Sequence, residues 1–110
     1  MEPLIKNAAH AAVISLTDSI AYESGKVVSM TLAQRPGVGM TLFAFDAGEG
    51  VSTHAAPGDA MVNVLDGDCQ ITIDGVEHQL TRGQSIIMPA GIAHAFKAIT
   101  PFKMLLTVVK

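Results

Sequence analysis

Few side chains in this sequence could carry chemistry, and four of them are histidines: His10, His54, His78 and His94. A neutral imidazole is a common ligand of divalent transition metals, and its titration near neutral pH also lets it donate or accept a proton. Cys69 is the only cysteine in the sequence, so neither an internal disulfide nor a cysteine-based metal cluster can form. The residue types therefore point to imidazole chemistry.

The elements that must position these histidines are predicted to be strands. Glycines and prolines interrupt the chain at short intervals, and the segments between them are rich in Val, Ile, Thr, Phe and Leu. Such a pattern is typical of an all-β sandwich or barrel. The predicted strands comprise residues 26–33, 38–46, 61–65, 69–73, 76–80, 85–88, 94–99 and 102–109. Asp66-Gly67 and Asp74-Gly75 are predicted to form the tight turns beside the strand at 69–73.

The N-terminal part of the chain has a different character. Residues 1–25 are predicted to form an arm of the same single domain, as a strand or a short helix, and residues 26–110 to form the barrel. Within the arm, residues 4–16 are the segment that could be helical. An apolar stretch at 8–16 lacks the cleavage pattern of a signal peptide, and one reduced cysteine suits a reducing compartment, so we expect a cytoplasmic protein.

Composition excludes several classes of protein. Of the 110 residues, 49% are hydrophobic and 15% are charged, which excludes a disordered chain. No apolar run reaches the roughly 18 residues of a spanning helix, so no membrane partner is expected. Seven scattered Lys and Arg residues stand against ten Asp and Glu residues, whereas nucleic-acid binding requires clustered positive charge.

The segment 102–109 is apolar on both of its expected faces. A strand with one solvated face would show polar residues at alternate positions. This strand is therefore expected to lie inside a sandwich or against a second subunit. Because few charges are available for the surface, we expect a homodimer.

Residues 48–67 and 83–98 together resemble the two motifs of the cupin superfamily. The first motif places His-x-His and a glutamate between two glycines, and the second places a glycine before Pro-x-Gly, a histidine and an asparagine. The matching positions here are Gly48, His54, Gly67, Gly83, Pro89, Gly91 and His94. The resemblance implies an all-β cupin fold, a double-stranded β-helix or jelly-roll barrel with an open mouth, and it implies that His54 and His94 line that mouth.

Three motif positions carry alanine instead of the family's residue. Ala56 replaces the second histidine, Ala60 the glutamate and Ala98 the asparagine. Metal-binding cupins use three histidines and the glutamate, so the resemblance leaves His54 and His94 as metal ligands. Two imidazoles alone make a poor metal site, because zinc and non-haem iron sites commonly supply a third protein ligand. The pair could bind a divalent ion such as Ni, Zn or Cu weakly, or form a metal-free polar spot in a pocket.

A third ligand would have to come from outside the motifs. His78 is the first candidate, because it shares the parity of Val76 and Leu80, which are expected to face the core. The alternative to metal binding is that His78 lies at the margin of a sheet, near a hairpin turn. Asp59 has the opposite parity to Ala60 and is expected to serve the adjoining turn rather than the pocket.

The predicted pocket at the mouth has a mostly apolar lining, made of His54, Ala56, Ala60, Val62, Met88, His94 and Phe96. Such a pocket suits a small, largely apolar or aromatic ligand fixed by a few polar contacts. The sequence therefore predicts a barrel that binds a small molecule and has an incomplete metal site. The alternative is a divalent-metal-dependent cupin enzyme, of dioxygenase or isomerase type, that uses His54 and His94.

Overall fold

The computed structural model describes residues 2–110, which contain nine strands and one short 3₁₀ helix, η1 (Thr17–Ser19). The strands are β1 (Val27–Arg35), β2 (Val38–Phe45), β3 (Gly50–His54), β4 (Asp59–Asp66), β5 (Asp68–Ile73), β6 (Val76–Thr81), β7 (Ser85–Met88), β8 (His94–Ala98) and β9 (Phe102–Val109). Among the described residues, no helix has the length and apolarity that crossing a membrane requires.

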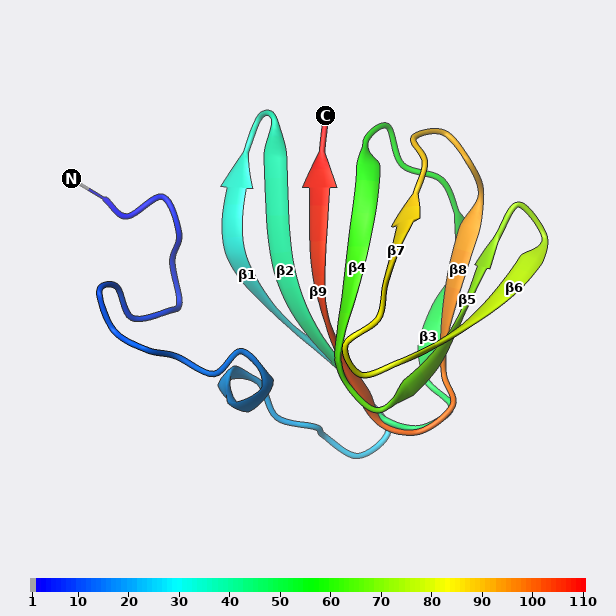
Figure 1. Ribbon diagram of the computed structural model, residues 1–110, viewed down its shortest axis with the longest axis horizontal. Helices are drawn as coiled ribbons and strands as arrows, with labels where there is room; N and C mark the ends of the chain where they lie inside the picture. Colours follow the sequence, from blue (N-terminus) through cyan, green and yellow to red (C-terminus); the bar gives the residue numbers. More distant parts are fainter. Residues whose placement is uncertain (1) are drawn as a thin grey trace.

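The strands form two antiparallel sheets. One has five strands in the order β1-β2-β9-β4-β7, and the other has four in the order β3-β8-β5-β6. In Figure 1 the strands converge at the bottom of the view and spread apart at the top. Within residues 2–110 no strand pairing joins one sheet to the other, so the jelly roll remains an open barrel.

Eight of the nine strands coincide with predicted segments, with ends that differ by at most two residues. The strand that the sequence did not predict is β3. Only Val51 within β3 is partly buried, so the sequence of β3 lacks the alternation of apolar and polar residues from which a strand can be predicted. The expectation that Val76 faces the core was wrong, because this residue beside the β5–β6 turn is 58% exposed.

The main core fills the space between the two sheets. On β4, the alternate residues Ala60, Val62 and Val64 are all buried there, as their parity predicts. Phe45 and Phe102 stack with ring centroids 4.6 Å apart. Cys69 is a free cysteine in the same core, and burial raises the pKa of its thiol to about 11, with a smaller contribution from the charge of Asp68.

A second apolar cluster lies on the outer face of the five-stranded sheet. Leu16 and Ile20 of the N-terminal arm pack there with Leu42 and Leu105. The inner face of β9 belongs to the main core and part of its outer face belongs to this cluster. The apolar character of both β9 faces is therefore explained largely within the chain, apart from the exposed Val109 at its end.

Polar contacts fasten the arm to the sheet. The Nζ atom of Lys103 donates a hydrogen bond to the carbonyl oxygen of Thr17 at 2.6 Å and lies 4.9 Å from the centre of the Tyr22 ring. The Tyr22 hydroxyl donates to Oδ2 of Asp66, also at 2.6 Å. Burial, together with this carboxylate, raises the pKa of Tyr22, so its hydroxyl keeps the donated proton.

The prediction that residues 4–16 could be helical was wrong, because neither a helix nor a strand forms there. Asn7 and Ala11 adopt positive φ angles, 60° and 54°, which interrupt a right-handed helix. The segment is instead held to β1, where the Lys6 amide donates to the Leu32 carbonyl at 2.7 Å. The side chain of Asn7 donates to the Thr31 carbonyl. Figure 1 shows this part of the arm outside the β1 end of the sheet.

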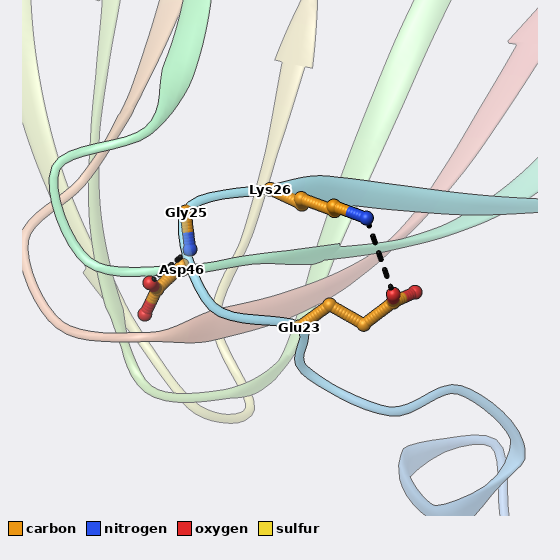
Figure 2. A network of polar contacts seen from close by, with 4 residues as sticks. All are labelled: Glu23, Gly25, Lys26 and Asp46. Carbon is orange, nitrogen blue, oxygen red and sulfur yellow. Dashed lines mark hydrogen bonds and ion pairs between the residues drawn. The ribbon is translucent and has the colours of Figure 1, made fainter.

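Figure 2 shows the junction between the arm and β1. The Asp46 carboxylate accepts hydrogen bonds from the backbone amides of Gly25, at 2.7 Å, and Ala47, at 2.8 Å, and these bonds lower its pKa. The nearby ion pair of Lys26 and Glu23, 3.8 Å apart, is exposed and adds little stability. The carboxylate therefore fixes the turn at which the chain enters the barrel.

Candidate functional site

The two sheet positions that carry His54 and His94 are paired in register. His54 ends β3 and His94 begins β8, and the β3–β8 ladder sets them opposite each other. Their ring centroids are 4.3 Å apart at an interplanar angle of 71°. Their Nε2 atoms approach to 3.1 Å. The strand pairing thus brings together two imidazoles that are forty residues apart in the chain.

Each ring makes the same contact with the backbone through its other nitrogen. Nδ1 of His54 lies 2.9 Å from the carbonyl oxygen of Ser52, and Nδ1 of His94 lies 3.1 Å from that of Ile92. A carbonyl oxygen only accepts, so each Nδ1 carries the proton when it makes this bond. In the neutral rings both Nε2 atoms then present lone pairs to each other. The arrangement favours an electron-pair acceptor at this point, either a proton or a metal ion.

The two rings differ in their surroundings. His94 is 4% exposed, whereas His54 is open to solvent. Phe96 lies beside both, with its ring centroid 5.9 Å from that of His94 and 6.5 Å from that of His54. Burial lowers the pKa of His94, the charge of a protonated His54 lowers it further, and the Ile92 carbonyl opposes the shift. The pair therefore has one buried member and one that an incoming molecule can reach.

Two hydrogen bonds join the loops beside the pair. The Gly91 amide donates to the Ala56 carbonyl at 2.8 Å, and the Ala90 amide donates to Oδ1 of Asp59 at 2.8 Å. Asp59 is exposed and, as its parity predicts, serves loop structure, although the loop it binds is the one before β8 rather than its own turn. The Gly91–Ala56 bond joins the segment after β3 to the loop before β8, and the Ala90–Asp59 bond joins the same loop to the start of β4.

The remaining residues of the predicted pocket are distributed differently. Ala60, Val62, Met88 and Phe96 are buried members of the main core. Ala56 lines a cavity of about 230 Å³. The other residues around this cavity are Gln34, Gly39, Thr41, Pro57, Leu106, Val108 and Lys110. Sequence reasoning missed them, since no motif or parity relation links these positions to the histidines.

The structure does not bring His78 to the pair. His78 lies on β6 opposite Ile71, so β5 separates it from β8. It lines a different cavity of about 370 Å³ together with Gln84 and Ser85. Within residues 2–110 no three His, Cys, Asp or Glu side chains are grouped so that they could hold a metal ion. His54 and His94 therefore offer two nitrogen donors, and the part of the chain that the structure describes adds no third His, Cys, Asp or Glu ligand.

Comparisons with known proteins agree with this architecture. The family model described as a cupin domain matches residues 41–109. A conserved protein of unknown function from Streptococcus pyogenes is 45% identical, with 99% of this chain and 96% of that one covered and a TM-score of 0.96. A cupin superfamily protein from Desulfitobacterium hafniense is 32% identical over 96% of both chains, with a TM-score of 0.91. No curated protein matches the chain.

Proposed function

This chain belongs to the cupin family, and we propose that it binds a small molecule at the mouth of its barrel, with the His54–His94 pair as the polar anchor. The observation that carries the proposal is the 3.1 Å approach of the two Nε2 atoms while both Nδ1 atoms face backbone carbonyls. A hydrogen bond within a protein contributes about 0.5–1.5 kcal/mol net. A ligand that donates a hydrogen bond to the exposed His54 ring would gain this contribution, with His94 behind it as the second imidazole.

The cavity beside Ala56 supports a ligand of modest size. Ala56 follows His54 by two residues, and its carbonyl is bonded to the loop before His94, so the cavity adjoins the segments that carry the pair. Its volume of about 230 Å³ lies below the roughly 300–1,000 Å³ of most ligand pockets. Leu106 and Val108 supply apolar walls, and Lys110 supplies a cation. These groups suit an aromatic or short aliphatic molecule with a hydroxyl or carboxyl group.

The test is a thermal-shift screen of untagged protein that has been treated with EDTA. A panel of phenols, alcohols and short carboxylic acids is compared on the wild type, on His54→Ala and on the His54→Ala/His94→Ala double variant. A ligand at a hundred times its Kd adds about 2.7 kcal/mol to the free energy of unfolding. We expect such a ligand to raise the Tm of the wild type by several degrees and to have little effect on either variant.

His78→Ala is the matched control, because it removes an imidazole from the same sheet outside the pair. It should respond to the ligand as the wild type does. Equal Tm increases in the wild type and the double variant, or no response of the wild type to any member of the panel, would count against the pair as the anchor.

A second candidate function is that of a divalent-metal-dependent enzyme of dioxygenase or isomerase type. One observation favours it: a metal-bound histidine usually donates its other ring N–H to a carbonyl or carboxylate, as both rings can here. His54 and His94 would bind the ion through Nε2 and leave its other positions to water and substrate. The bound ion would act as a Lewis acid toward an oxygen atom of the substrate. Two protein donors fit a weakly held ion.

Metal analysis of protein purified without an affinity tag separates the two candidates. The enzyme candidate predicts about one Ni, Zn, Cu or Fe ion per chain in wild type that is purified and then equilibrated with the metal salt, and loss of this ion in the double variant. A wild type without metal that still binds its small molecule supports the metal-free anchor instead.

A further inference from the structure

The turn between β5 and β6 consists of two residues, Asp74 and Gly75, and Figure 1 shows it at the outer tip of this hairpin. Both residues are exposed, and their φ angles are 50° and 78°. An Asp-Gly pair suits such a turn, because both central residues adopt positive φ. Glycine also has no Cβ to shield its amide nitrogen, so this nitrogen can approach the carboxyl group of the residue before it.

The reaction open to such a pair is a ring closure followed by hydrolysis. The Gly75 amide nitrogen forms a bond to Cγ of the protonated Asp74 carboxyl group, and the amide proton leaves with the carboxyl hydroxyl as water. The resulting five-membered succinimide takes up one water, which breaks one of its two C–N bonds. Breakage at Cγ restores aspartate. Breakage at the main-chain carbonyl carbon yields isoaspartate, and the whole sequence needs no oxidant, reductant or enzyme.

The surroundings of the turn leave both reacting groups free. Within residues 2–110 the Asp74 carboxylate takes part in no hydrogen bond or ion pair, and the Gly75 amide has no backbone acceptor. A Cβ added at Gly75 would meet nothing within 4 Å. Ring closure at this turn therefore requires only the tip of one hairpin to move, and such tips open at low cost in free energy.

The chain contains a second Asp-Gly pair, Asp66-Gly67, in very different surroundings. The Asp66 carboxylate accepts a hydrogen bond from the Tyr22 hydroxyl at 2.6 Å, and the residue itself lies in the β4–β9 ladder. The backbone of Gly67 is packed against that of Pro101. Ring closure at this pair would require the arm, β4 and β9 to separate, so the fold protects Asp66 and leaves Asp74 unprotected.

We propose that Asp74-Gly75 is a site of spontaneous covalent modification in the folded protein, at which Asp74 converts to isoaspartate while Asp66 is preserved. Isoaspartate carries the main chain through Cβ and Cγ, which adds one atom to a two-residue turn. The length of such a turn fixes the register of its hairpin, so the added atom should distort the β5–β6 end of the sheet.

This distortion should reach the histidine pair. Ile73, the residue before the turn, is paired with His94 in the β5–β8 ladder. The Asp74 amide donates a hydrogen bond at 2.9 Å to the carbonyl oxygen of Ala93, the residue before His94. Isomerisation thus alters the main chain at the point that holds the start of β8 in place.

Digestion of aged protein tests the site. Wild type is kept at physiological temperature and neutral pH for weeks, and it is then unfolded and digested with endoproteinase Asp-N, which cleaves before aspartate and not before isoaspartate. Cleavage before Asp74 should fall severalfold relative to fresh protein, while cleavage before Asp66 should not change. Protein aged in guanidinium chloride should lose cleavage at both positions, because neither turn is folded there.

Asp74→Glu is the matched control, because glutamate keeps the carboxylate but would have to close a six-membered ring, which forms more slowly. Labelling by an isoaspartyl methyltransferase should be severalfold higher in aged wild type than in the aged variant. In two-dimensional NMR spectra the amide signals of Ala93 and His94 should shift in aged wild type and not in aged Asp74→Glu.

Intact cleavage before Asp74 in the aged folded protein would overturn the proposed site. Equal losses at Asp66 and Asp74 in the folded protein would overturn the protection of Asp66 by the fold. Unshifted His94 signals in protein that has converted at Asp74 would overturn the link to the histidine pair.

Discussion

At the scale of single residues, the two imidazoles of the site make matching backbone contacts in unlike surroundings. His94 is enclosed by the strand ladder and Phe96, whereas His54 remains accessible to water. A buried imidazole resists charge, because burial disfavours its protonated form. Under the proposed function, a ligand would therefore reach the exposed His54 ring first, and the buried His94 ring would lie behind it.

The lowered pKa of His94 predicts a pH dependence of stability. In the folded protein His94 protonates at lower pH than in the unfolded chain, whose value is near 6.5. Below that value the unfolded chain therefore binds more protons, and the free energy of unfolding falls as pH drops toward the folded-state pKa. Urea unfolding of EDTA-treated protein above and below about pH 6.5 should show this loss, and it should be smaller in His94→Asn.

An NMR titration of the imidazole signals gives an independent measure. The signal that disappears in His94→Asn should have a midpoint below that of a free histidine. A midpoint at or above that of free histidine would contradict the prediction.

The meeting of His54 and His94 follows from the motif resemblance, since both occupy matched positions in two motifs that the barrel brings together. The packing of Met88 and Phe96 into the core could not be predicted in the same way. Whether an inward-facing side chain lines a cavity or fills it depends on neighbours from other strands, and the pattern within one strand does not contain that information. The carbonyl contacts of the two rings likewise depend on local backbone conformation.

At the scale of elements, the turns decide where strands can begin. Gly67 joins β4 to β5 with φ of 75°, and an added Cβ there would collide with the Pro101 carbonyl oxygen. Gly75 joins β5 to β6 with φ of 78°, and an added Cβ would meet nothing within 4 Å. Both substitutions to alanine impose left-handed strain, but only the first also forces two backbone segments apart.

We therefore expect Gly67→Ala to cost more than Gly75→Ala. The strain common to both is about 1–2 kcal/mol, and the collision should add at least a further ~1 kcal/mol in Gly67→Ala. Urea unfolding of the two variants measures the difference. Equal losses would mean that the 101–102 segment yields without cost.

Strands with one buried face were predictable because their apolar residues alternate, as in the β5 residues Cys69 and Ile71, both of which are buried. β3 was not predicted because its side chains are mostly exposed. It is a strand through its backbone pairing with β8, which its own sequence does not reveal. The conformation of residues 4–16 was predicted wrongly for a related reason, because contacts with β1 override the weak local helical preference of this segment.

At the scale of the whole molecule, the arm is part of what makes the five-stranded sheet stable. Its residues 16–22 cover apolar side chains that would otherwise face water, and the hydroxyl of Tyr22 ties them to Asp66 on β4. Removing this attachment should loosen residues 16–22 and let water reach the apolar side chains beneath them more often.

Tyr22→Phe tests the attachment. The variant keeps the ring beside Lys103 and loses the hydrogen bond to Asp66, which should cost about 1–2 kcal/mol. Tyr22→Ala loses the ring as well and should cost more. Urea unfolding measures both, and hydrogen exchange should show faster exchange of the amides of residues 16–22. Unchanged exchange in Tyr22→Ala would show that Leu16 and Ile20 hold the arm without it.

Cys69, the single cysteine of this chain, is buried in the core between the two sheets. The pKa of its thiol, about 11, keeps the thiol protonated near neutral pH. Iodoacetamide reacts with thiolates, so it can modify Cys69 only in molecules whose interior has momentarily come apart. The natural sequence thus contains its own alkylation probe, and the rate of carbamidomethylation by mass spectrometry would report how often the barrel opens.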